Sequence, residues 1–117
     1  MEIENIKFKA KQLNSEKWFE GDLVRLGNRV CIGGDHIKDG ITDVDPLTVC
    51  MFTGLKDKNG TPIYEGDIIM QKDNNAERRG DINWDSKAAA FCFGQDFLVH
   101  YSSEDMVVIS NKFNKKK

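Results

Sequence analysis

Two groups of side chains in this sequence are of types that could do chemistry. Cys31, Asp35, His36 and Asp39 lie close together in one polar stretch, and Glu65 and Asp67 flank a single glycine. A cysteine beside a histidine is the pair that nucleophilic catalysis uses. Two carboxylates two residues apart on a regular strand share a face and could hold a cation.

Neither group forms a complete site at the level of sequence. The thiol, imidazole and carboxylates of the first group match no zinc spacing, and no third group that would orient a nucleophile is recognisable. Gly66 interrupts the strand between the two carboxylates, and no third ligand is evident. His100 lies in an apolar stretch, as a satisfied core histidine does. We therefore predict no catalytic residues, no metal site and no cofactor.

The composition indicates one globular domain. The chain has 117 residues, of which 39% are hydrophobic and 31% charged, enough for one core and too few for two ordinary domains. We expect a single domain over residues 1–111 and a frayed basic tail over residues 112–117. The three cysteines form no CxxC pair, and Cys50 and Cys92 lie in apolar runs, which predicts small core residues.

Charge and hydropathy restrict the class of function. The net charge is −2. The four lysines of the tail contribute +4, so residues 1–111 carry a charge of −6. An acidic body disfavours sequence-independent binding to DNA. The longest apolar stretch, Ala88 to Phe93, is too short to cross a membrane. The first four residues lack the basic start and apolar core of a signal peptide, so we expect a cytoplasmic protein.

The elements that would position these residues read as short strands. Ile6, Phe8 and Ala10 alternate with lysines, and Trp18 to Leu26 follows as a returning strand, which predicts an N-terminal hairpin. Close-set turn signals separate the later strands, and the stretch from Asn74 to Arg79 reads as a loop. We expect an all-β fold, a small partly open barrel that is SH3-like in its C-terminal half. The later expected strands are Arg29–Ile32, Leu47–Phe52, Asp67–Gln71, Gly80–Trp84, Ala88–Phe93, Phe97–Tyr101 and Met106–Ile109.

The most informative stretch, residues 52–69, reads F-T-G-L-K-D-K-N-G-T-P-I-Y-E-G-D-I-I. Asn59-Gly60 predicts positive φ angles in a tight turn, and Gly54 and Gly66 predict close backbone approach. Asp57 and Asp67 are expected to bond back to nearby backbone amides. Turn geometry does not require the charges of Lys56 and Lys58, which are left without a structural reason.

One internal echo accompanies this stretch. Phe19 to Val24 and Tyr64 to Ile69 share the pattern aromatic, Glu, Gly, Asp, aliphatic, aliphatic. We interpret Glu-Gly-Asp as a strand-entry device, and two such entries suggest two related, paired strands.

The same stretch resembles the signature of the YopX-like family of phage and prophage proteins. Residues 52–60 and 63–69 match that signature, and the resemblance extends to the N-terminal hairpin and to Val108-Ile109. The C-terminal segment departs from the family pattern, with Phe113-Asn114 and lysines in place of the usual ending. The resemblance implies a small β-rich fold encoded in mobile genetic elements, without an established biochemical activity.

From these features we predict a non-enzymatic, phage-derived accessory protein that acts through contacts with an unknown protein partner. The expected interaction surface is the turn formed by Lys56, Asp57, Lys58 and Asn59. The alternative is a nucleic-acid-associated barrel that uses Arg78, Arg79, Trp84 and the lysine tail. Trp84 and Phe91 are otherwise expected in the core. Exposed sheet edges also make a homo-oligomer an open alternative.

Overall fold

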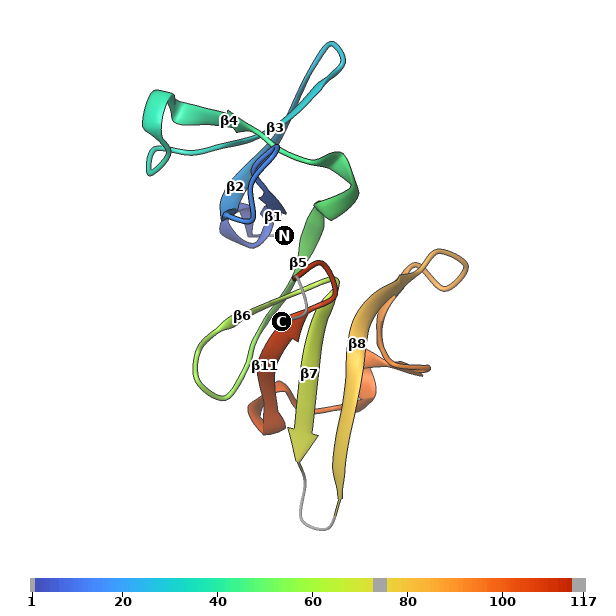
Figure 1. Ribbon diagram of the computed structural model, residues 1–117. Coiled ribbons are helices and arrows are strands. Elements are labelled where there is room, and N and C mark those ends of the chain that lie inside the picture. The colour runs from blue at the N-terminus through green and yellow to red at the C-terminus, as the bar shows by residue number, and fades with distance from the viewer. Residues whose placement is uncertain (1, 73–75, 115–117) are drawn as a thin grey trace. The chain divides into compact units, whose positions relative to one another are not determined.

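A computed structural model describes residues 2–72 and 76–114 (Figure 1). The described residues contain β-strands and short 3₁₀ turns and no α-helix, so the all-β prediction is confirmed. The strands are β1 (Phe8–Lys11), β2 (Trp18–Leu26), β3 (Arg29–Gly33), β4 (Ile41–Asp43), β5 (Cys50–Lys56), β6 (Pro62–Tyr64), β7 (Asp67–Lys72), β8 (Glu77–Asp85), β9 (Ala90–Phe93), β10 (Asp96–Phe97) and β11 (Met106–Asn111). The 3₁₀ turns are Ile3–Asn5, Lys38–Gly40, Pro46–Thr48, Leu98–His100 and Ser103–Asp105.

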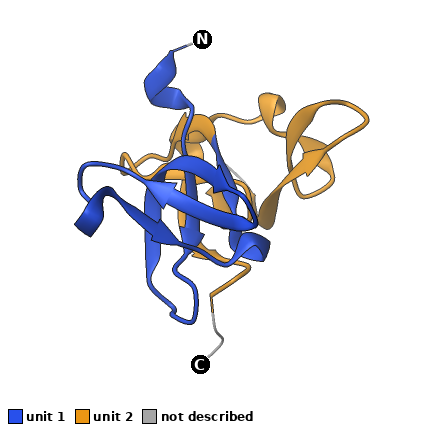
Figure 2. Ribbon diagram, turned by 90° about the horizontal axis from the view of Figure 1, so that it is seen from above, with its two compact units in different colours: residues 1–52 blue, residues 53–117 orange. Residues whose placement is uncertain are grey.

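The chain divides into two compact units, residues 1–52 and 53–117, which are coloured separately in Figure 2. The boundary lies inside β5. The first residues of β5 pair with β1, and the strand then continues as the partner of β6. The expectation of one domain over residues 1–111 stays a prediction, and each unit is described here by itself.

Unit 1 (residues 1–52) is an antiparallel sheet built on the predicted N-terminal hairpin. In hydrogen-bonded order its strands are β4, β3, β2, β1 and the start of β5. Phe8 pairs with Gly21 and Lys11 with Trp18, which confirms the hairpin of β1 and β2. One face of this sheet carries a small core, with Ala10, Ile32 and Val44 buried together.

Unit 2 (residues 53–117) contains the β5–β6 hairpin and a five-stranded antiparallel sheet in the order β10, β9, β8, β7, β11. Its core is larger and gathers side chains that are distant in sequence. The alternation of β7 directs Asp67, Ile69 and Gln71 inward. The buried apolar members of the core are Ile63, Ile69, Ile82, Phe93, Leu98 and Met106.

Two expected elements are wrong. Phe97 to Tyr101 is not a strand, because β10 ends at Phe97 and residues 98–100 form a 3₁₀ turn closed by a hydrogen bond from Tyr101 N–H to the carbonyl of Leu98. The expected loop from Asn74 to Arg79 is also wrong at its end. Residues 77–79 belong to β8, where Arg78 pairs with Gln71 of β7, and residues 74 and 75 lie outside the described residues.

The sheets are antiparallel and are not closed into a barrel. The SH3-like comparison for the C-terminal half stays a prediction. Within the described ranges, no helix has the length and hydropathy that a membrane span requires.

Candidate interaction surfaces

The signature turn is built around the side chain of Asp57. The amide N–H of Gly60 donates to the carbonyl of Asp57 at 3.0 Å, and the N–H of Asp57 donates to the carbonyl of Thr61 at 2.9 Å. Gly60 has a φ of 83°, whereas Asn59 is not among the residues with positive φ. The connection is therefore a type I turn closed by a left-handed glycine rather than the expected pair of positive φ angles.

The same carboxylate also holds the C-terminal strand. Oδ1 of Asp57 accepts hydrogen bonds from the N–H groups of Asn59 and Thr61, each at 2.9 Å. Oδ2 accepts from the N–H of Val108 in β11 at 3.0 Å. Burial alone raises the pKa of Asp57, but the three backbone donors outweigh it and the pKa is lowered. The carboxylate therefore stays ionised while it joins two segments.

A second contact holds the C-terminal end of β11. Oδ2 of the fully buried Asp67 accepts from the N–H of Tyr64 at 2.8 Å. Its Oδ1 accepts from Nδ2 of Asn111 at 3.0 Å. Just beyond, the N–H of Lys112 donates to the carbonyl of Gly66 at 2.9 Å. Gly66 and Asp67 of the signature thus bond the end of β11 and the first residue of the tail.

These contacts give the signature an architectural role. Asp57 and Asp67 accept hydrogen bonds from nearby backbone amides as the sequence suggested. In addition, Asp57 bonds Val108 in the middle of β11, and Asp67 bonds Asn111 at the end of that strand. Gly54 differs from its expected role, because its φ is 88° and a Cβ there would meet nothing within 4 Å. Its reason is the positive φ angle rather than close backbone approach.

The predicted interaction surface is only partly available. Lys56, Lys58 and Asn59 are exposed, but Asp57 is 6% exposed and its carboxylate points inward, so its place in that surface is wrong. The backbone N–H of Lys58 donates to the carbonyl of Met106. The side chain of Lys58 lines a hollow of about 180 Å³ that also contains charged residues of both signs, Lys72, Glu104 and Asp105.

The echo at Phe19 to Val24 does not repeat this arrangement. Gly21 lies inside β2, where a Cβ would collide with the carbonyl oxygen of Gly33, and Asp22 is exposed. The suggested pairing of the two related strands is wrong, because β2 pairs with β1 and β3 while β7 pairs with β8 and β11. The shared sequence pattern therefore has two different roles. In β2 it provides a glycine, Gly21, that packs closely on the backbone of Gly33, and at β7 it provides a buried carboxylate, Asp67, that accepts hydrogen bonds.

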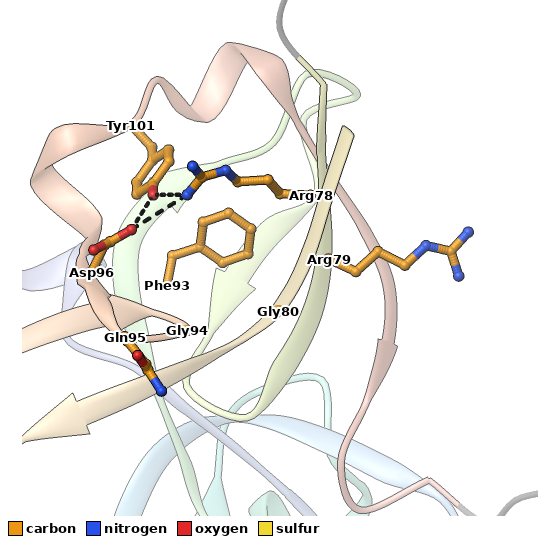
Figure 3. Close-up of a pocket in the computed structure, with 8 residues that line it drawn as sticks. All are labelled: Arg78, Arg79, Gly80, Phe93, Gly94, Gln95, Asp96 and Tyr101. Carbon is orange, nitrogen blue, oxygen red and sulfur yellow. Dashed lines mark hydrogen bonds and ion pairs between the residues drawn. The ribbon is translucent and has the colours of Figure 1, made fainter. Parts of the chain in front are cut away.

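The structure does not bring Trp84 to the other two alternative nucleic-acid residues, Arg78 and Arg79, which both line one hollow. Arg78 and Arg79 leave β8 on opposite faces, as Figure 3 shows. Trp84 lies six residues beyond Arg78, roughly 20 Å along an extended strand. Trp84 is 45% exposed, so its expected place in the core is wrong, and it packs edge-on against Phe91 with ring centroids 5.0 Å apart.

Arg78 belongs to a polar hollow of about 210 Å³ above Phe93 (Figure 3). Its Nη1 lies 2.8 Å from the hydroxyl of Tyr101 and 3.4 Å from Oδ2 of Asp96. The Tyr101 hydroxyl donates to the same Asp96 oxygen at 2.6 Å, and this hydrogen bond is the main cause of the raised pKa of Tyr101. Arg78 is therefore engaged within the protein.

On the other side of Tyr101 lies an apolar groove of about 390 Å³, the largest of the three hollows described here. Sequence reasoning missed it. Leu98 is buried beneath the groove, whereas Val99 at its rim is 84% exposed and Phe97 is 39% exposed. Trp84, packed on Phe91, extends the apolar surface along the sheet. The lining residues are Thr53, Leu55, Ala90, Phe91, Phe97, Leu98, Val99 and Tyr101, all from unit 2.

Cys31 and the two histidines lie in different local surroundings. Cys31 is buried and its Sγ lies 3.3 Å from Oδ1 of Asp43; burial is the main cause of its raised pKa. Nε2 of His36 lies 2.6 Å from the carbonyl oxygen of Glu20. The expected core position of His100 is wrong, since this residue is exposed in the 3₁₀ turn. Within residues 2–72 and 76–114, no group of three potential metal ligands gathers.

Cys50 and Cys92 are confirmed as buried residues, in β5 and β9, and neither forms a disulfide; Sγ of Cys50 lies 3.2 Å from the carbonyl oxygen of Thr48. The predicted basic tail is described only as far as Asn114. There the N–H of Phe113 donates to Oδ1 of Asn111 and the N–H of Asn114 to its carbonyl, so residues 112–114 continue from β11 as a bonded turn. Residues 115–117 lie outside the described residues.

Comparison with known proteins gives one match. A protein-family model described as YopX protein matches residues 2–115, nearly the whole chain. No curated protein and no solved structure matches the sequence.

Proposed function

Because the chain belongs to the YopX family, we propose that it is a non-enzymatic accessory protein that acts by binding another protein. The proposed setting is a phage or prophage and the bacterial cytoplasm, in keeping with the resemblance that the signature carries. The proposed binding surface is the apolar groove of unit 2.

One observation carries this proposal, the exposure of apolar side chains around the groove. Val99 is 84% exposed and Phe97 39% exposed, while Phe91 and Leu55 line the walls between them. Apolar side chains gathered around a hollow favour binding, because covering them removes apolar surface from water. A volume of about 390 Å³ lies in the range of recognition pockets.

The turn at Lys56 to Asn59 is proposed as a secondary contact. Lys56 follows Leu55 of the groove wall directly, and Lys58 and Asn59 are exposed beyond it. Exposed charges at the rim of an interface influence association rate and specificity more than affinity. The groove therefore supplies most of the binding free energy in this proposal.

A selection from a random-peptide display library tests the proposed function. Peptides selected on the wild-type protein should lose at least about tenfold in affinity for Val99→Asp, since a buried unpaired carboxylate disfavours an apolar contact. Leu47→Asp is the matched control, because Leu47 is 80% exposed and lies in unit 1. Selected peptides that bind wild type and Val99→Asp equally well would contradict the proposal.

A further inference from the structure

The apolar surface around the groove is larger than one small molecule would cover. Phe91 lines the groove and also packs against Trp84, which is 45% exposed. Val99 and Phe97 extend the surface on the opposite rim. The spread of these side chains over β8, β9 and the turn at residues 98–100 suits a chain segment that lies across the groove.

Carboxylates stand at both ends of β9, the strand that contributes Ala90 and Phe91 to the groove. Asp85 pairs with Ala90 and Asp96 pairs with Phe93. Burial, followed by the negative charges of Asp85 and Asp96, raises the pKa of the Cys92 thiol between them. Both carboxylates are next to the groove lining, because Asp85 lies opposite Ala90 and Asp96 directly precedes Phe97.

The local cations compensate these charges only in part. Nη1 of Arg78 approaches one oxygen of Asp96, Oδ2, at 3.4 Å, and both side chains are more than half exposed. The hydroxyl of Tyr101 donates to the same oxygen at 2.6 Å, so within the described residues both contacts fall on Oδ2 and neither involves the second oxygen, Oδ1. The carboxylate of Asp85 is bonded by the backbone N–H of Lys87 at 3.0 Å, a neutral donor that leaves its charge in place.

From this arrangement we propose that the partner is an extended protein segment that places a large apolar side chain in the groove and a lysine or arginine next to it, facing Asp96. This inference rests on the proposed function and adds the chemistry of the partner. The apolar residue supplies burial, and the basic residue supplies complementarity to the acidic ends of β9.

Two synthetic peptides test this partner chemistry, Lys-Val-Phe-Val-Lys and Glu-Val-Phe-Val-Glu, each with blocked ends. Binding is followed by the fluorescence of Trp84 in a Trp18→Phe background, which removes the tryptophan of unit 1. We expect the basic peptide to bind at least about fivefold more tightly, and Asp96→Asn to weaken it about two- to fivefold. Asp22→Asn, an exposed carboxylate of unit 1, is the control.

The outcomes separate this inference from the proposed function. Equal binding of both peptides, lost in Val99→Asp, would overturn the basic partner and leave the groove as a binding surface. Binding that Val99→Asp does not affect would overturn both. Sedimentation that shows a dimer dissociated by Val99→Asp would assign the groove to a second copy of the chain and so overturn the extended partner segment.

Discussion

The carboxylate of Asp57 and the backbone N–H of Val108 form a 3.0 Å hydrogen bond between residues 51 positions apart. This bond joins the turn of the β5–β6 hairpin to the C-terminal strand β11. Since the same carboxylate also accepts from the N–H groups of Asn59 and Thr61, one side chain fixes both the turn and its attachment. The signature thus adds side-chain bonds to the pairing of β11 with β7.

Replacing Asp57 by alanine should destabilise unit 2. The change removes an ionised acceptor from three backbone donors, and we expect a loss of roughly 3 kcal/mol in the free energy of unfolding. Urea unfolding followed by Trp84 fluorescence in the Trp18→Phe background measures it. The exposed Glu104→Ala is the control and should change stability by less than about 0.5 kcal/mol. Equal stability of both variants would show that the bond to Val108 is dispensable.

The stability of unit 2 should also fall in acid. The pKa of Asp57 is lower in the folded than in the unfolded state, so its contribution is complete above the unfolded value of about 3.9. It is lost as the pH drops through the lower folded value. Urea midpoints at pH 7 and pH 3 should therefore differ less in Asp57→Asn than in the wild type. An unchanged difference would mean that other carboxylates cause the acid sensitivity.

Asp67 and Asn111 offer a test by exchange of side chains. In Asp67→Asn, an amide NH₂ must face either the N–H of Tyr64 or Nδ2 of Asn111, so we expect a loss of about 2 kcal/mol. Adding Asn111→Asp restores a donor opposite an acceptor and should recover part of that loss, a coupling of about 0.5–3 kcal/mol. If the stability loss of the double variant equals the sum of the two single losses, the bond between Asp67 and Asn111 does not couple the two positions and its proposed role is contradicted.

Asp22→Asn is the matched control for that exchange, because Asp22 occupies the same place in the echo and is exposed. It should change the free energy of unfolding by less than about 0.5 kcal/mol. If Asp67→Asn destabilises the protein and Asp22→Asn does not, the loss of stability comes from the buried position of Asp67 and not from the Glu-Gly-Asp motif itself.

The alternative function has its own test. If the protein associates with nucleic acid, single-stranded oligonucleotides should bind at low salt, where electrostatic attraction is least screened, and Arg79→Glu should weaken binding. Arg79 is the informative position because Arg78 already contacts Asp96 and Tyr101. We expect no binding, given the acidic body of the chain. Binding at low salt that Arg79→Glu reduces would favour the nucleic-acid alternative over the groove.

Sequence patterns predicted much of the fold because local rules determine it. The alternation from Phe8 to Lys11 and from Trp18 to Leu26 specified the N-terminal hairpin, and turn chemistry predicted that Asp57 and Asp67 bond to backbone amides. Which strand each carboxylate would also reach could not be read from the sequence. The bonds to Val108 and Asn111 depend on the order of strands, a tertiary property.

The groove was missed for a related reason. The short apolar run from Phe97 to Tyr101 predicts a strand, but the chain turns at residues 98–100 instead. The turn buries Leu98 and leaves Val99 exposed beside it. Trp84 was expected in the core for its size, yet its position on β8 keeps nearly half of it exposed. Adjacent large apolar residues in a short non-strand segment are the signal that could have indicated this surface.

The most direct test compares the groove with the signature turn in one binding experiment. Peptides selected on the wild-type protein are titrated against Val99→Asp, the control Leu47→Asp, and the double variant Lys56→Glu, Lys58→Glu. We predict a loss of at least about tenfold in affinity for Val99→Asp, none for Leu47→Asp, and less than about fivefold for the double variant. Binding that survives Val99→Asp and is lost in the lysine variant would contradict the groove and assign function to the turn.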